Sequence, residues 1–158
     1  MLRTGEQIVA GYTLQRRLGR GGFGEVWRAC GPGGTPVAIK LIDVSHKHGW
    51  KEYGAARRMR EIRHPHLLPV HALWLLDEEG VPFDDGALDE LAAMVGRAHH
   101  GTLASTRCPS MLVIAMALGE KNLYQRLKEH EDEGRKGIPV HELLGYLEDA
   151  AKGIDFLN

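Results

Sequence analysis

The stretch Leu18-Gly19-Arg20-Gly21-Gly22-Phe23-Gly24-Glu25-Val26 decides the fold of this 158-residue chain. Its glycines follow a Gly-x-Gly-x-x-Gly-x-Val pattern. A residue without a Cβ lets backbone amides approach phosphate oxygens and permits positive φ in a tight turn. Strand-like sequence lies on both sides of the stretch, so it predicts a glycine-rich hairpin loop rather than the strand-to-helix turn of a dinucleotide-binding βαβ unit.

A second motif, Val37-Ala38-Ile39-Lys40, lies in the next strand-like run, which extends to Ile42. Alternation along a strand places Ala38 and Lys40 on one face, and Val37 and Ile39 on the other. A small side chain leaves room for a flat base, while a lysine supplies a positive charge to phosphates. The two motifs together predict a nucleotide-binding site.

In this order and spacing, the two motifs resemble those of the protein-kinase family, in particular the eukaryotic-like (Hanks-type) serine/threonine kinases of bacterial type. The resemblance implies an α+β fold: a small lobe, made of a five-stranded antiparallel sheet and one regulatory helix, followed by the first helices of a large lobe. Residues 8–118 would form the small lobe with its glycine loop and hinge. Residues 119–158 would form the first two helices of a truncated large lobe.

The remaining segments follow the order of elements in that family. Residues 8–18 lead into the first expected strand, which starts at Gly11-Tyr12. The other expected strands are 26–30, 37–42, 67–76 and 111–114, and the expected helices are 50–63, 123–130 and 139–157. His64-Pro65 should end the first helix, because the residue before a proline avoids helical dihedral angles. Residues 78–109 depart from the pattern as a long insert between the fourth and fifth strands, and residues 87–99 within it have helical spacing.

The resemblance implies that ATP binds between the glycine loop and the hinge. Leu18 and Val26 would cover the two sides of the adenine, and residues 117–119 would form the hinge. Met116 would limit the depth of the pocket, although Ala115 is an alternative at that position. The expected nucleotide-binding residues are Leu18, Gly19, Arg20, Gly21, Gly22, Phe23, Gly24, Glu25, Val26, Ala38, Lys40, Met116, Ala117 and Leu118.

In the resembling family, a helix glutamate holds the lysine toward the α- and β-phosphates. The two candidates are Glu52 and Glu61. At about 100° per residue, Glu52 shares a stripe with Ala56 and Met59, whereas Glu61 lies on the opposite side. We therefore expect Lys40 and Glu52 to be the catalytic pair, although Glu52 precedes His64 by twelve residues, about one helical turn more than is usual in the family.

The chain lacks the catalytic-loop and Asp-Phe-Gly motifs, since it contains no Arg-Asp pair and Asp155-Phe156 is followed by Leu157. The catalytic aspartate and the Mg²⁺ ligands are therefore expected after Asn158, and this chain alone is expected to be inactive. In a longer parent, the reaction would be transfer of a phosphoryl group from ATP to protein serine or threonine hydroxyls. The alternative is a catalytically silent, pseudokinase-type module that binds ATP or another protein.

Composition argues against several other classes of protein. A net charge of -1 provides no strong field for nucleic acid or anionic membranes. Cys30 and Cys108 have no CxxC spacing and suit a reducing compartment, so we expect a cytoplasmic protein. The longest apolar run, residues 111–118, is too short to span a bilayer. His46 and His48 lack further ligands nearby, so we expect no metal site within the chain.

Overall fold

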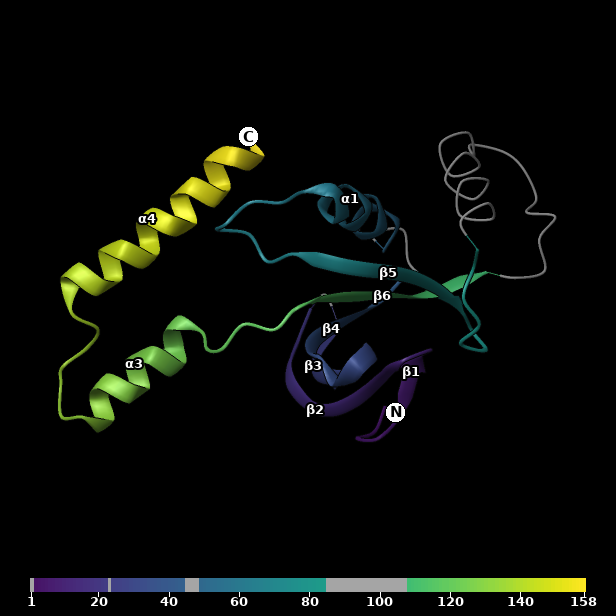
Figure 1. Cartoon of the computed structure of the whole chain (residues 1–158), viewed down its shortest axis with the longest axis horizontal. Coiled ribbons are helices and arrows are strands. Elements are labelled where there is room, and N and C mark those ends of the chain that lie inside the picture. The colour runs from purple at the N-terminus through teal and green to yellow at the C-terminus, as the bar shows by residue number, and fades with distance from the viewer. Residues whose placement is uncertain (1, 23, 45–48, 85–107) are drawn as a thin grey trace.

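The structure of the chain, a computed structural model, describes residues 2–22, 24–44, 49–84 and 108–158, with residues 49–52 described by their backbone. Its body is one antiparallel sheet of six strands, and helix α1 (Gly49–Glu61) lies over β5 of that sheet (Figure 1). Helices α3 (Leu123–Asp132) and α4 (Val140–Leu157) extend from one end of the sheet. The strands are β1 (Gln7–Val9), β2 (Tyr12–Gly21), β3 (Gly24–Cys30), β4 (Pro36–Asp43), β5 (Val70–Asp77) and β6 (Pro109–Ala117), and a short 3₁₀ turn, η1 (Pro32–Gly34), joins β3 to β4.

The strands pair in the order β1-β2-β3-β4-β6-β5, so the last strand in sequence is an inner strand of the sheet. Its apolar run has the burial of a central strand. Leu112 and Val113 are both fully buried, and they belong to apolar clusters on opposite faces of the sheet. The sequence-based expectation of a strand buried on both faces is confirmed.

The sheet has one strand more than the five expected from the sequence. The first strand was expected to start at Gly11-Tyr12, and β2 starts there; the additional strand is β1, which precedes it. The two strands are joined at Gly11, whose φ of 83° lies in a region that glycine adopts readily. This turn folds β1 back onto β2, so that Val9 pairs with Tyr12. The rest of residues 8–18 lies in β2, where Leu14 is fully buried.

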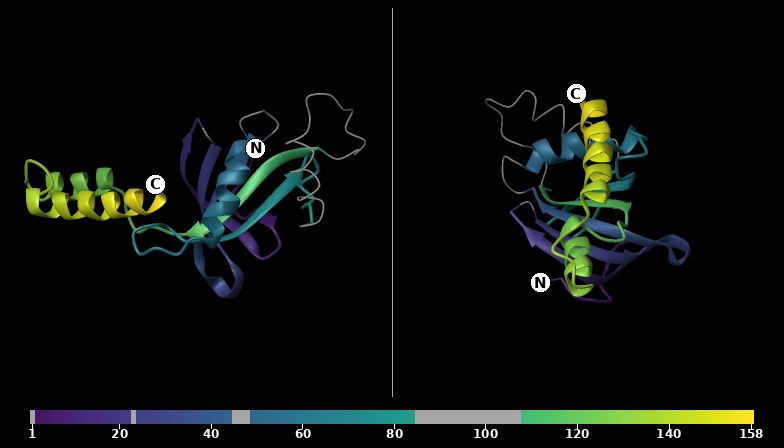
Figure 2. Two further views of the ribbon diagram at one scale, coloured as in Figure 1. Left: turned by 90° about the horizontal axis from the view of Figure 1, so that it is seen from above. Right: turned by 90° about the vertical axis from the view of Figure 1, so that its left-hand side faces the viewer.

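Two apolar clusters cover the two faces of the curled sheet, which Figure 2 shows from two further directions. The first cluster contains Trp27, Val37, Ile39 and Leu41 from β3 and β4. The second contains residues of β4, β5 and β6 together with Tyr53 and Ala56 of α1. Val37 and Ile39 thus face away from α1, which confirms the alternation inferred for this strand.

Helix α1 packs against the sheet through one side. Tyr53 and Ala56 are each 7% exposed, and Met59 packs against the same cluster. The helix ends at Glu61, three residues before the His64-Pro65 pair that was expected to stop it.

Side-chain hydrogen bonds fix α3 and hold it against α4. Asn122 caps α3 by accepting a hydrogen bond from the Gln125 amide at 2.8 Å, and the Gln125 side chain accepts one from the Asn122 amide. The Arg126 guanidinium binds the Glu142 carboxylate of α4 through two nitrogens, at 2.5 and 3.2 Å. Glu142 also accepts a hydrogen bond from the Tyr146 hydroxyl at 2.9 Å.

Helix α4 contacts the loop between α1 and β5. Gly153 is buried, and a Cβ added there would lie 3.0 Å from the carbonyl oxygen of His66. The ring of Phe156 stacks on His64 with centroids 4.5 Å apart. Much of the remaining surface of α4 is apolar and exposed, including Val140, Leu144, Leu147 and Ile154.

The insert after β5 begins with a turn in which the Asp77 side chain accepts hydrogen bonds from the Glu79 and Val81 amides. The helix expected over residues 87–99, and the histidines at 46, 48, 99 and 100, lie outside the described residues. Within the described ranges, no helix has the length and apolar character needed to cross a bilayer.

Candidate nucleotide-binding site

The glycine-rich stretch is the hairpin that joins β2 to β3. Gly19 pairs with Val26, and Gly21 pairs with Gly24, so Gly22 lies at the tip. The expected glycine-rich hairpin is confirmed. Phe23 itself lies outside the described residues.

The glycines of this hairpin differ in what surrounds them. Gly24 has a φ of 114°, and a Cβ there would overlap the carbonyl oxygen of Leu41 on β4. By contrast, a Cβ on Gly19, Gly21 or Gly22 would meet nothing within 4 Å. Gly24 is therefore required by the fold itself, whereas the other three leave open space beside the backbone.

Lys40 lies in a cross-strand row next to this hairpin. It pairs with Val26 of β3 on one side and with Ile114 of β6 on the other. Directly paired residues of antiparallel strands share a face, so Val26 and Lys40 are neighbours on the face that α1 partly covers. Ala38, 6% exposed, lies two residues away on the same face.

The register of β6 distinguishes the two candidates for the residue that limits the pocket. Met116 pairs with Ala38 and packs against the cluster under α1. Ala115 pairs with Ile39, is fully buried and belongs to the cluster on the opposite face. Of the two, Met116 lies beside Ala38 on the face of Lys40.

The chain leaves the sheet at the expected hinge. The Ala117 amide donates a hydrogen bond to the Pro69 carbonyl at 3.0 Å, so this N–H group is already engaged. Leu118 follows the end of β6 and is partly buried. Its backbone groups make no hydrogen bond within the described ranges, so they are open to a ligand.

Leu18 lies where the pairing of β2 and β3 shifts register, between the Arg17–Trp27 and Gly19–Val26 pairs. An extra residue at such a bulge re-aims the local side chain. The Leu18 side chain is 42% exposed, so it is not part of the sheet core. This exposure leaves Leu18 free to contact a ligand at the edge of the hairpin.

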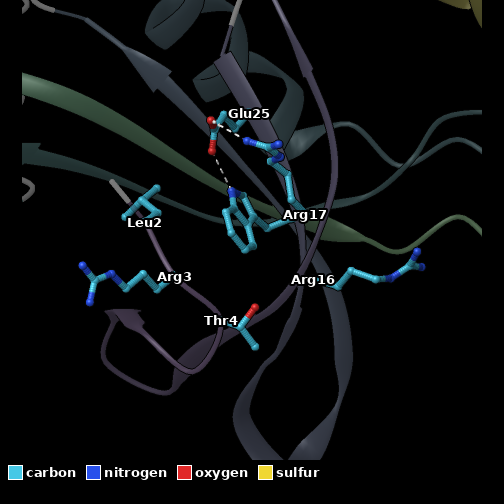
Figure 3. Close-up of a pocket in the computed structure, with 7 residues that line it drawn as sticks. Leu2, Arg3, Thr4, Arg16, Arg17 and Glu25 are labelled. Carbon is cyan, nitrogen blue, oxygen red and sulfur yellow. Dashed lines mark hydrogen bonds and ion pairs between the residues drawn. The ribbon is translucent and has the colours of Figure 1, made fainter.

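Two other expected site residues face away from Lys40. Glu25 alternates with Val26, and its carboxylate accepts a hydrogen bond from the Trp27 indole nitrogen at 3.0 Å. Arg17 approaches the same carboxylate at 3.5 Å (Figure 3). Arg20 approaches it at 3.6 Å. Because Trp27 belongs to the cluster on the far face, the side chains of Arg20 and Glu25 lie away from the row of Val26 and Lys40.

The proposed partner of Lys40 is only partly described. Position 52 belongs to α1, on the helical stripe of Ala56 and Met59, but the Glu52 side chain lies outside the described part of the chain. Glu61 is exposed at the end of the same helix. No group of three or more His, Cys, Asp or Glu side chains able to hold a metal ion occurs among the described residues.

Comparison with known proteins gives the family. Tyrosine-protein kinase Srms of Mus musculus is 39% identical over 150 residues, which cover 93% of this chain and 23% of that protein. CBL-interacting protein kinase 4 of Oryza sativa subsp. japonica is 41% identical over 75 residues, which cover 42% of this chain and 16% of that protein. No family model matches the chain.

The fold agrees with these sequence relatives. The crystal structure of the Mycobacterium tuberculosis PknI kinase domain superposes with a TM-score of 0.57 and 22% sequence identity, covering 99% of this chain and 51% of that one. The chain belongs to the protein-kinase family. It has the small-lobe fold of a protein kinase, and it spans about half of the PknI domain and a quarter or less of its curated kinase relatives.

Two features of this kinase small lobe were not predicted from the sequence: the direction of the Glu25 side chain and the hydrogen bond between Ala117 and Pro69. Strand alternation alone separates Glu25 from Val26, so the sequence contained a signal that Glu25 faces away from Lys40. The Pro69 carbonyl that engages the Ala117 amide had no such signal, because the contact joins segments 48 residues apart in the chain.

Proposed function

We propose that this chain is the ATP-binding part of a cytoplasmic protein serine/threonine kinase, with residues 8–118 as its small lobe and residues 119–158 as the first helices of its large lobe. The observation that carries the proposal is the placement of Val26, Ala38, Lys40 and Met116 on one face, beside a hairpin whose glycines leave open space. Apolar residues and one cation at adjoining positions match the base and the phosphates of a nucleotide.

Each part of the site has a distinct role in this proposal. The amides of Gly19 and Gly21 approach the phosphates, because no Cβ blocks that side of the hairpin. Lys40, held by Glu52, binds the α- and β-phosphates. Leu18, Val26 and Met116 enclose the adenine, and the backbone of Leu118 binds its edge. Arg20 and Glu25 contribute through their backbone, since their side chains face the other way.

Mg²⁺ would neutralise phosphate charge during transfer, but the described residues contain no set of ligands for it. The reaction steps that depend on the metal are therefore not assigned to this chain. Its own residues bind and orient ATP.

The acceptor that we propose is a serine or threonine hydroxyl, on the basis of the resemblance of the motifs to kinases of the bacterial type. Several of the similar proteins are tyrosine kinases, among them protein-tyrosine kinase 6 and Srms of Mus musculus. Phosphoamino-acid analysis of protein phosphorylated by a kinase domain that contains this chain would decide the question. Phosphoserine or phosphothreonine is expected, and phosphotyrosine alone would refute this part of the proposal.

Calorimetric titration of the chain with ATP tests the binding function. Charged hydrogen bonds contribute about 1.5–3 kcal/mol, so Lys40→Met should weaken ATP binding by about tenfold or more. Lys136→Met, which removes a charge from an exposed loop, serves as the matched control and should bind as the native chain does. Equal affinity of the native chain and Lys40→Met, or no ATP binding by the native chain, would refute the proposal.

A further inference from the structure

Two arginines lie on the same face of the sheet as the proposed ATP site. Arg16 of β2 pairs with Arg28 of β3, and Arg28 pairs with Ala38 of β4, which pairs in turn with Met116 of β6. Directly paired residues of antiparallel strands share a face, so the two arginines continue the row of residues proposed to surround the base. The Arg16 side chain extends away from Glu25, which faces the other side of the sheet (Figure 3).

The described part of the chain does not compensate the charges of these two arginines. The Arg28 Nε donates a hydrogen bond to the neutral side-chain oxygen of Gln15 at 3.3 Å. The Arg16 side chain makes no hydrogen bond or ion pair with a described residue, and both arginines are exposed. By contrast, Arg17 on the opposite face lies 3.5 Å from the Glu25 carboxylate.

The arrangement of the charges favours an anion on this face. The two arginines oppose each other directly across β2 and β3, and like charges in this arrangement are destabilising. The adjoining cross-strand row, Gly19–Val26–Lys40–Ile114, adds a third cation, and neither of these two described rows contains a carboxylate. Glu52, the proposed partner of Lys40, offsets one of the three charges. A positive potential therefore remains beside the proposed site.

The position of the two arginines determines how they can act on ATP. Arg16 is three residues from Gly19 along β2, or roughly 10 Å, and the phosphates are proposed to lie near Gly19. The hydrogen bond to Gln15 directs Arg28 toward β2, away from Ala38. At an ionic strength of about 0.01 M, the Debye length is about 30 Å, so charges at this separation attract without contact.

We propose that Arg16 and Arg28 form a cationic rim that accelerates association of ATP with the face of Lys40 by long-range attraction and does not contact the bound nucleotide. This inference rests on the proposed ATP-binding function and identifies residues that set the rate of that binding. Charges at the rim of a binding site act mainly on the association rate and its salt dependence. The attraction grows with the charge of the ligand, so it acts on ATP and not on neutral adenosine.

Stopped-flow association of fluorescently labelled ATP with the chain at low ionic strength tests the inference. Arg16→Gln and Arg28→Gln should each lower the association rate constant about twofold and leave the dissociation rate constant unchanged. At about 1 M salt, where the Debye length is about 3 Å, both variants should associate as fast as the native chain. Lys136→Gln makes the same change of net charge in the exposed loop between α3 and α4 and should associate at the native rate.

Two further measurements separate the effect of charge from an effect on structure. Arg16→Lys and Arg28→Lys keep the positive charge without the guanidinium group, so both should associate with ATP at the native rate. Adenosine that carries the same fluorophore, chosen to be neutral, should associate equally fast with the native chain and with every arginine variant. A distorted site would slow adenosine as well.

Three outcomes would overturn the inference while ATP binding by the native chain still depends on Lys40, so that the proposed function stands. They are native association rates in both glutamine variants at low ionic strength, equal slowing in the lysine variants, and equal slowing with adenosine. Absence of ATP binding by the native chain would refute the proposed function and this inference together.

Discussion

At the scale of single residues, Gly24 shows how one position in a glycine loop can serve the fold. Its φ is 114°, and a Cβ would lie 3.0 Å from the carbonyl carbon of Leu41, in addition to overlapping the carbonyl oxygen. Both the torsion and the backbone contact exclude other residues, because neither Gly24 nor β4 can move without breaking the β3–β4 pairing.

We therefore predict that Gly24→Ala lowers the free energy of unfolding by about 2–3 kcal/mol. Gly21→Ala is the matched control, since a Cβ there meets nothing within 4 Å, and its stability should stay within about 0.5 kcal/mol of native. Urea unfolding followed by circular dichroism measures both values. Equal stability of the two variants would show that the close approach of β3 to β4 at Gly24 is wrong.

The contrast between Gly24 and the other loop glycines allows effects on folding to be distinguished from effects on ligand binding. Gly19 and Gly21 have no neighbour within the chain that requires glycine. Any loss of ATP affinity from adding a Cβ at these positions would therefore reflect the ligand rather than the stability of the sheet.

At the scale of elements, the side of α1 that faces the sheet predicts which glutamate is the partner of Lys40. Position 52 lies on the stripe of Ala56 and Met59 that packs on the sheet, and Glu61 is exposed. If Glu52 and Lys40 act as a pair on ATP, their substitutions should not be additive.

We predict that Glu52→Gln weakens ATP binding by about tenfold in the native background and much less in the Lys40→Met background. Glu61→Gln should leave the affinity of both backgrounds unchanged. Calorimetric titrations of the single and double variants give the coupling. Coupling of Lys40 to Glu61 instead of Glu52 would mean that the assignment of the helix face is wrong.

The contact between α3 and α4 has a defined dependence on pH. The hydrogen bond from Arg126 lowers the pKa of Glu142 from 4.5 to about 2. A carboxyl group whose pKa is lower in the folded chain stabilises it above the ordinary pKa, and this contribution is lost as the pH falls through the folded value. The contribution of Glu142 should therefore be lost between pH 4.5 and about 2.

We predict that acid weakens the packing of α3 on α4 over this interval and that Glu142→Gln removes this part of the pH dependence. Glu148→Gln is the control, because Glu148 pairs with Lys152 within α4 and does not contact α3 through that pair. Acid titrations followed by far-ultraviolet circular dichroism provide the comparison. Identical acid profiles for native and Glu142→Gln would contradict the assigned role of the Arg126–Glu142 contact.

Local sequence signals predicted most of these elements. The glycine pattern located the hairpin, strand alternation assigned the faces of Val37 and Ala38, and the apolar run of β6 indicated a central strand. The start of β2 after Gly11 was predicted, but the short strand β1 before it was not, because a single glycine within a strand-like run does not reveal that its backbone reverses direction.

At the scale of the whole molecule, the contact of α4 with the α1–β5 loop joins the helical segment to the sheet. Gly153 permits this contact, since its Cβ would lie 3.0 Å from the His66 carbonyl oxygen and 3.2 Å from Leu67 Cδ2. The Phe156 ring on His64 and the Asp149 carboxylate, 3.5 Å from His66, complete the contact. Sequence periodicity predicted α4 as a helix, but it contained no information on where that helix packs.

We predict that Gly153→Val separates α4 from the loop and increases hydrogen exchange in both segments. Gly145→Val makes the same change within the same helix, where an added Cβ meets nothing within 4 Å, and should leave exchange in the loop unchanged. Hydrogen exchange measured by mass spectrometry compares the two variants. Equal protection of residues 62–69 in both variants would show that this contact does not hold α4.

The sequence was sufficient to locate the candidate site, but it did not fully predict which side chains of the site lie on the same face of the sheet. Two motifs identified the glycine hairpin and Lys40, and the strand register then favoured Met116 over Ala115 as the neighbour of Ala38. The choice depended on how β4 pairs with β6, and these strands lie more than 60 residues apart in the chain. Pairing across such a distance depends on the whole sheet rather than on local pattern.

The most direct test of the central claim is an amide chemical-shift map of the isotope-labelled chain during titration with ATP. If ATP binds the face of Lys40, the shifts should change at residues 19–26, Ala38, Lys40 and residues 116–118, and residues 2–4 should remain unchanged. Changes confined to α3 and α4 or to residues 2–4, with none at Lys40 and Leu118, would contradict the assignment of this face as the nucleotide site.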